Sequence, residues 1–172
     1  EGASKSPLEQ LKEENAAAAA LCLQVGVRSC KALSEAESFT WCDEGLSTTD
    51  LATLGKLIPV LPALNALRIK EKPASASPDG RQLVEGLGVG ALPALTSFWL
   101  INVRVGDAGA STLAAALDRG ALQRLQTLQL EKATAIGDAG LVALAPALRR
   151  RPALAILSLD HNPFGDEGLA AL

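Results

Sequence analysis

One apolar phrase recurs along most of this chain at a nearly constant spacing. The phrase is Leu-x-x-Leu-x-Leu or a close variant. Its last position falls at Trp41, Ile69, Leu100, Leu130 and Leu159, which lie 28, 31, 30 and 29 residues apart. A period of roughly 30 residues is typical of a solenoid, in which each repeat is too thin to bury its apolar side alone and stacks on its neighbours. The recurrence therefore predicts a stack of about five repeats over residues 36–172.

Each repeat is predicted to hold one strand and one helix. Alternating apolar positions predict the strand. Helical spacing predicts the segments that follow, which are Leu51–Val60, Arg81–Gly88, Ala110–Leu117 and Leu141–Arg150. Pro62, Pro93 and Pro152 stand shortly before the next strand, where a helix usually has already ended. We therefore expect an α/β fold, a horseshoe arc with a parallel sheet on its concave side and helices on its convex side.

Composition narrows the class of partner. Hydrophobic residues make up 48% of the chain but aromatics only 3%, so the core is expected to consist of leucine and alanine. The net charge is −3 and the longest basic run is Arg149–Arg151, whereas a nucleic-acid-binding surface carries a basic stripe. The most apolar run, Ala16–Leu23, is much shorter than the roughly 20 residues of a membrane span. We expect a protein partner, no nucleic acid and no membrane insertion.

The number and spacing of the cysteines indicate the redox state of the cellular compartment. Cys22, Cys30 and Cys42 are odd in number and show no paired spacing, which favours a reducing, intracellular compartment with buried free thiols. The chain has no methionine, even at position 1. A processed chain and a fragment would both explain this, so an organelle and a removed targeting segment stay open.

The first 35 residues do not follow the repeat and are predicted to form a helical cap. Ser6 and Pro7 suit the N-cap and first position of a helix that runs to Leu23, and a second helical piece is expected around Arg28–Ser34. A solenoid needs a polar cap on its first apolar layer. The alternative is an arm that docks on a partner.

A Gly-Asp-x-Gly turn precedes the helices of the last three repeats. It reads Gly106–Gly109, Gly137–Gly140 and Gly165–Gly168. We expect the first glycine to permit a tight reversal and the aspartate to cap the helix that it begins. Ser47–Asp50 and Ser77–Gly80 are expected to do the same in repeats one and two. The insertion Lys70–Ser77 is predicted to be a mobile loop.

The combined phrase Leu-x-x-Leu-x-Leu-x-x-Asn-x-(Ile/Phe)-Gly-Asp-x-Gly resembles the ribonuclease-inhibitor-like subclass of leucine-rich repeats. Leu154–Gly168 carries it completely, and Leu95–Gly109 and Leu125–Gly140 carry it with departures. Val103 stands at the asparagine position of repeat three, and repeat four has no clear occupant, so an incomplete asparagine ladder is expected. The chain stops at Leu172 in mid-helix, which predicts a solenoid truncated or open at its C-terminus.

The resemblance also implies a role. One branch of this subclass acts as GTPase activators, so the resemblance makes regulation of a small GTPase an alternative function for this chain.

The sequence contains no recognisable catalytic or ligand-binding set. His161 is the only histidine, which excludes a histidine metal cluster and a Ser-His-Asp arrangement. The run Gly86-x-Gly88-x-Gly90 follows a helix and precedes a strand, the reverse of a dinucleotide-binding loop. The segment from Asp160 lacks the bidentate glutamate of a calcium loop. We therefore expect a non-enzymatic protein without a cofactor.

The predicted binding surface is the concave sheet. Side chains alternate across a strand, so one outward row should hold Thr40, Arg68, Trp99, Gln129 and Ser158. Residues after the strands should form a charged rim, namely Asn102, Glu131, Lys132, Asp160 and His161, together with Asp43, Lys70 and Glu71. Tryptophan and arginine are enriched in binding hot spots, although Trp99 could instead only cover Ile101 and its neighbours. The preferred function is a protein-interaction scaffold. The alternative is a structural subunit or fragment of a larger assembly.

Overall fold

The computed structural model describes residues 34–73, 77–132 and 135–172, together with Ala16, Ala19, Ala20, Leu23 and Ala32. The predicted N-terminal cap lies almost entirely outside the described residues, as does the middle of the insertion after β2. Both stay predictions.

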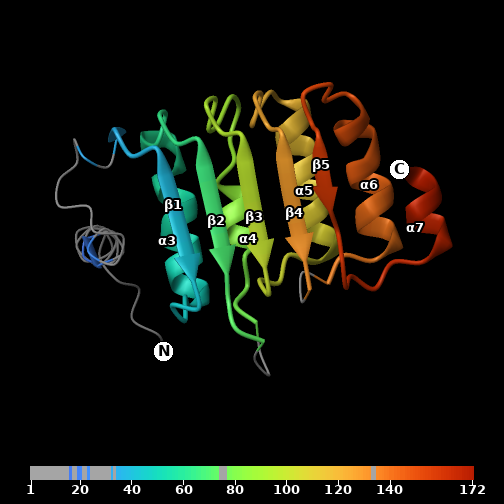
Figure 1. Ribbon diagram of the computed structural model, residues 1–172, viewed down its shortest axis with the longest axis horizontal. Helices are drawn as coiled ribbons and strands as arrows, with labels where there is room; N and C mark the ends of the chain where they lie inside the picture. The colour runs from blue at the N-terminus through green and yellow to red at the C-terminus, as the bar shows by residue number, and fades with distance from the viewer. Residues whose placement is uncertain are drawn as a thin grey trace, which may run out of the picture.

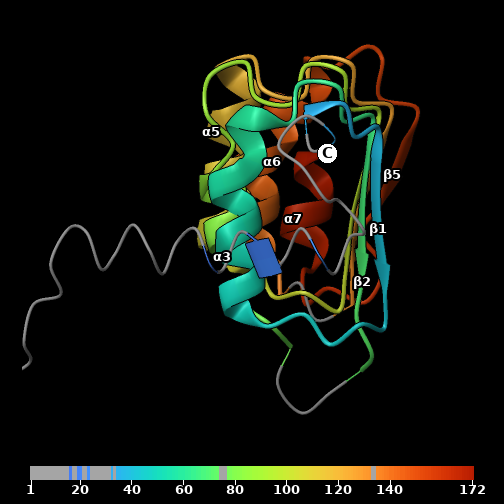
Figure 2. The ribbon, with the colours of Figure 1, turned by 90° about the vertical axis from the view of Figure 1, so that its left-hand side faces the viewer.

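Five parallel strands form a single sheet in chain order. They are β1 Ser38–Cys42, β2 Ala66–Lys70, β3 Ser97–Ile101, β4 Thr127–Glu131 and β5 Ile156–Ser158. Every neighbouring pair is parallel. Figure 1 shows the strands side by side with the helices behind them, and the turned view in Figure 2 separates the two layers. The predicted α/β solenoid of five repeats is confirmed.

The helices of the second layer differ in length. They are α3 Thr48–Leu57, extended by the 3-10 turn η1 Ile58–Val60, then α4 Arg81–Glu85, α5 Gly106–Asp118, α6 Asp138–Arg149 and α7 Asp166–Ala171. The helix predicted over Arg81–Gly88 is shorter than expected and ends at Glu85. At this end the backbone of Gly86 lies against that of Gly55, since a Cβ on Gly86 would stand 2.3 Å from the Gly55 carbonyl oxygen. The first glycine of the Gly86-x-Gly88-x-Gly90 run therefore allows α3 and α4 to pack closely.

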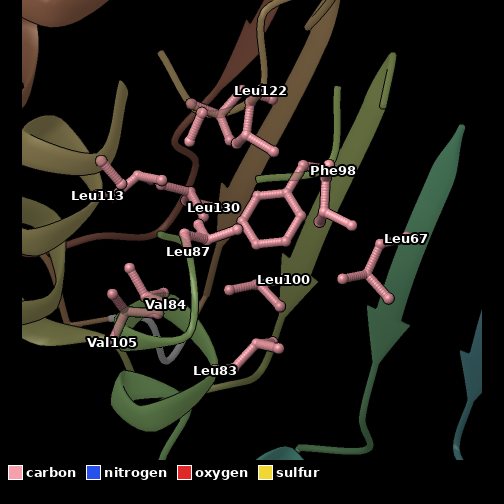
Figure 3. Close-up of a cluster of buried hydrophobic side chains, with 14 of the residues drawn as sticks. Leu67, Leu83, Val84, Leu87, Phe98, Leu100, Val105, Leu113, Leu122 and Leu130 are labelled. Atoms are coloured by element: carbon pink, nitrogen blue, oxygen red, sulfur yellow. The ribbon is translucent and has the colours of Figure 1, made fainter. Parts of the chain in front are cut away.

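The core lies between the two layers and is built from the leucine phrases. Leu67, Phe98 and Leu128 are fully buried, and so are the residues two positions later on the same strands, Ile69, Leu100 and Leu130. Figure 3 shows the Phe98 ring projecting from β3 among leucines and valines of several repeats. The side chains around it include Leu67, Leu87, Leu100 and Leu130. Because each repeat is thin, the single ring of Phe98 contacts side chains from three repeats.

The aspartates of the Gly-Asp-x-Gly turns do not cap their own helices, so this prediction was wrong. Asp107 lies in the first turn of α5, and its Oδ1 accepts the backbone N–H groups of Gly137 at 2.7 Å and Gly140 at 3.0 Å. Asp138 repeats the arrangement one repeat later, where it accepts from Gly165 at 2.7 Å and Gly168 at 2.8 Å. Asp107 and Asp138 therefore each cap the helix of the following repeat and join two neighbouring repeats of the stack.

The second glycine of each turn makes room for the aspartate of the preceding repeat. A Cβ on Gly140 would stand 2.5 Å from Asp107 Oδ1, and one on Gly168 would stand 2.7 Å from Asp138 Oδ1. The predicted reversal at the first glycine is confirmed only at Gly106, whose φ is +68°. Gly137 is extended instead, with φ −92°. The motif is mainly a device for contact between repeats.

The first two helices begin differently. Ser47 and Asp50 form the predicted capping box at α3, since the Asp50 N–H donates to Ser47 Oγ and the Ser47 N–H donates to Asp50 Oδ2. At α4 the N-cap is Gly80, and Asp79 accepts from the backbone and guanidinium of Arg81. The hydrogen bond from the Arg81 side chain lowers the pKa of Asp79. Only repeat one therefore uses the local cap that the sequence predicts.

The asparagine ladder is more complete than predicted, because it shifts by one residue. Asn162 donates to the carbonyl oxygens of Leu130 and Leu159, as the repeat pattern requires. In repeat three Asn102, one position earlier, donates to the carbonyl oxygen of Glu71 at 2.7 Å. Glu71 itself accepts the N–H groups of Gly45 and Leu46, each at 3.0 Å. The loops after the strands are thus tied together although Val103 occupies the asparagine position and is buried.

Candidate protein-binding surface

The five residues predicted for the concave row lie side by side across the whole sheet. The strand register pairs Thr40 with Arg68, Arg68 with Trp99, Trp99 with Gln129, and Gln129 with Ser158. Neighbouring strands are about 4.8 Å apart, so the row spans about 19 Å. This length suits an extended segment of a partner protein.

Outward-facing side chains of the row are exposed to different degrees. Thr40 is exposed on the edge strand, whereas Arg68, Trp99, Gln129 and Ser158 are half-buried. Ala66, two residues before Arg68 and therefore on the same face of β2, is only 4% exposed. The face is therefore accessible along the predicted row and closed beside it on β2.

Arg68 and Trp99 form a stacked pair near the middle of the row. The guanidinium carbon of Arg68 lies 4.7 Å from the centre of the Trp99 ring, a cation–π distance. Nε of Arg68 and Nε1 of Trp99 are buried donors for which the described residues supply no acceptor. Trp41 Nε1, on the inner side of β1, is the third such donor. Two of the three unsatisfied donors thus belong to one contact on the concave face.

Only some of the residues predicted for the rim are exposed to solvent. Asp43, Lys70, Asp160 and His161 are exposed, and Glu131 and Lys132 are half-buried. Asn102 and Glu71 are 4% and 5% exposed. Their placement on the rim was wrong, because both side chains are used in the ladder that joins the loops. The sequence offered no signal for this, since the ladder residues stand one position before the expected one.

A left-handed residue follows four of the five strands. Asp43, Asn102, Lys132 and His161 have φ values of 62°, 58°, 56° and 62°. Aspartate and asparagine tolerate this conformation better than most residues. The repeated turn gives the side chains after the strands a common direction at the carboxyl edge of the sheet, where Lys132 also donates its N–H to the Asp160 carbonyl oxygen at 2.8 Å.

The remaining groups of chemical interest stand apart from this row. Cys42 was predicted to be buried but is an exposed free thiol, because it occupies an outward position of β1; Cys22 and Cys30 lie outside the described residues. No described set of three or more His, Cys, Asp or Glu residues is placed to hold a metal ion. Of the helices that the structure describes, none is long and apolar enough to cross a membrane.

The basic run Arg149–Arg151 is used between repeats. Arg149 donates to carbonyl oxygens at the end of α7, and Arg151 donates to the carbonyl oxygens of Leu117, in the last turn of α5, and of Ala121 beyond it. Arg150 pairs with Asp118 at 2.6 Å. These three arginines are thus bonded to carbonyl oxygens near helix C-termini or to an aspartate of a neighbouring repeat. They do not form a free basic patch.

Comparison with known proteins agrees with this geometry. The family model described as Leucine Rich repeat matches residues 122–145 and 154–172, which fall in repeats four and five. The described repeats have the fold of a leucine-rich-repeat solenoid. The first three leucine-rich repeats share the sheet, the register and the buried leucine positions of the matched ones. The comparison with curated proteins found no similar sequence.

Leucine-rich repeats generally mediate protein–protein interactions and are typically non-enzymatic. The match is to leucine-rich repeats as a whole, so membership of the ribonuclease-inhibitor-like subclass stays a prediction.

Proposed function

We propose that this leucine-rich-repeat solenoid is an interaction scaffold that binds a protein on its concave face. The observation that carries the proposal is the stacked Arg68–Trp99 pair near the centre of a row that crosses all five strands. The half-exposed Gln129 and Ser158 continue the row, and the exposed residues after the strands border it.

The energetics of the pair favour a binding role over simple covering of the sheet. A buried donor without an acceptor costs about 1–3 kcal/mol. The pair contains two such donors, Nε of Arg68 and Nε1 of Trp99. Buried polar groups without a partner are uncommon in folded proteins, so two of them at one contact favour a role beyond covering the sheet. Tryptophan and arginine near the centre of a contact are also the residue types that most often dominate binding energy.

Removing the pair should remove binding. In a pull-down of native partners, we expect Arg68→Ala combined with Trp99→Ala to lower partner recovery about tenfold or more, because hot-spot residues contribute about 2 kcal/mol or more. The matched control is Arg119→Ala combined with Val142→Ala, two exposed positions on the helical side. Equal recovery with the concave-face variant and wild type would place the interface elsewhere.

A second candidate function, a structural subunit of a larger assembly, is favoured by the exposed end of the stack at β5 and α7. Ile156, Leu169 and Leu172 are 52%, 58% and 39% exposed there. Asp166 occupies the place of Asp107 and Asp138 in the series, but no described N–H group donates to its carboxylate. Within residues 135–172 this layer offers apolar surface, a sheet edge and an unused acceptor, which further repeats or another chain would cover.

Light scattering of the protein tests the assembly role. We expect a mass above that of one chain, 17.7 kDa, for wild type, and a fall towards it for Ile156→Lys combined with Leu169→Lys, because charges on an apolar contact oppose its burial. Val142→Lys, on the exposed side of α6, serves as the control and should leave the mass unchanged. A wild-type protein that stays monomeric at high concentration and co-purifies with no other chain would contradict this role.

Regulation of a small GTPase stays a prediction from the resemblance alone. The asparagines after the described strands do not favour it, because the amides of Asn102 and Asn162 are used within the ladder.

A further inference from the structure

Charges on the concave face are ordered across the sheet. Arg68 and Lys70 stand two residues apart on β2 and therefore on the same face, about 7 Å from each other along the strand. Glu131 ends β4 and Asp160 follows β5. The cationic part of the face lies over β2, and the anionic part lies at the ends of the last two strands.

Arg68 carries a charge that its surroundings do not neutralise. No acidic side chain in the described part of the chain forms an ion pair with it. The carboxylate of Glu71, three residues on, is already bound to the N–H groups of Gly45 and Leu46. Asp43, at the end of the neighbouring strand, donates its backbone N–H to the Lys70 carbonyl oxygen. Among the described residues, no ion pair joins its side chain to Arg68 or Lys70.

Trp99 holds this guanidinium in position. The ring lies 4.7 Å from the guanidinium carbon, and Nε of Arg68 is buried although the residue as a whole is half-buried. An arginine that is stacked on an aromatic face has lost part of its side-chain freedom before a ligand arrives, which lowers the entropic cost of binding. The planar fork of a guanidinium matches the two oxygens of a carboxylate.

We propose that Arg68, stacked on Trp99 and supported by the charge of Lys70, receives the carboxylate of an aspartate or glutamate in the partner protein. This inference rests on the concave-face function proposed above and adds the chemistry of the partner. The partner segment crosses the strands in an extended form, with its acidic side chain over β2. Its following residues lie over Gln129 and Ser158, whose amide and hydroxyl groups both donate and accept hydrogen bonds.

Three synthetic peptides test the chemistry on the intact chain. One alternates threonine with glutamate, the second replaces each glutamate by glutamine, and the third replaces it by phosphoserine. The readout is the indole N–H resonance of Trp99, assigned by its loss in Trp99→Phe, which separates it from that of Trp41. We expect the glutamate peptide to shift this resonance and to bind about tenfold or more tightly than the glutamine peptide, because hydrogen bonds to a charged group are stronger than neutral ones.

Variants of the same chain locate the contact. Arg68→Gln should weaken glutamate-peptide binding about tenfold or more, and Arg68→Lys severalfold, because lysine keeps the charge without the planar fork. Glu131→Gln, on the anionic side, should leave the affinity unchanged or raise it. Thermal unfolding of each variant checks that the fold is retained.

Several results would overturn the proposal. Equal binding of the glutamate and glutamine peptides, preference for the phosphoserine peptide, no shift with any peptide, or an unchanged affinity in Arg68→Gln would each do so. If native-partner recovery depends on Trp99 but not on the charge at Arg68, the acidic-partner inference fails and the concave-face function survives. If recovery depends on neither residue, the concave-face function itself fails.

Discussion

Replacement of Asp107 by alanine is expected to lower the free energy of unfolding by about 2 kcal/mol. The carboxylate accepts two backbone N–H groups at the start of α6, from Gly137 and Gly140. Loss of a charged acceptor at a helix N-terminus costs about 0.5–2 kcal/mol in ordinary caps, and hydrogen bonds to a charged group are at the upper end of the range. Because the donors belong to the next repeat, the variant weakens the stack and not only one helix. Urea unfolding followed by circular dichroism measures the change.

The chain supplies its own control for this prediction. Asp166→Ala removes the same residue from the same motif in the last repeat, where no described N–H group donates to it, and should change stability by less than about 0.5 kcal/mol. Gly140→Ala should be destabilising although alanine favours helices, since the new Cβ would stand 2.5 Å from Asp107 Oδ1. An Asp107 effect no larger than the Asp166 effect would show that the contacts between repeats contribute little.

Replacement of Phe98 by alanine is expected to lower the free energy of unfolding by about 3–5 kcal/mol. Phe98 is fully buried and projects from the central strand between the sheet and the helices (Figure 3). In a core of leucine and alanine no neighbouring large side chain can fill the space that its ring leaves. Leucines from adjacent repeats line that space, so the cavity loosens several layers at once.

Phe164→Ala is the matched control for this core substitution. Phe164 is only half-buried in the last repeat, so its removal leaves an open surface rather than a closed cavity and should cost clearly less. Urea titration of both variants with equal m-values would allow their midpoints to be compared. Equal losses for the two variants would contradict the view that Phe98 is a central contact between repeats.

Part of the candidate binding surface was predictable because strand alternation is a local property. The spacing of Leu64, Leu67 and Ile69 determines which side of β2 is buried, and so places Arg68 outward. The equal spacing of the repeats then aligns Arg68 with Trp99 and Gln129, as the register confirms. What the spacing leaves open is whether two outward side chains touch. The stacking of Arg68 on Trp99 depends on their rotamers and on the distance between strands, which only the tertiary structure supplies.

The sequence alone determined the repeat, the parallel sheet and the two-layer arrangement, because apolar periodicity and turn residues act over short stretches of chain. The tertiary structure decided the partners of the polar groups. Asp107 bonds to glycines about 30 residues away, and Asn102 takes a ladder position that the motif assigns to residue 103. Such contacts join residues in different repeats, and a shift of one residue in a loop changes them without disturbing the periodicity. For this reason the sequence predicted the fold of this solenoid well, whereas the bonds that hold its repeats together had to be seen in three dimensions.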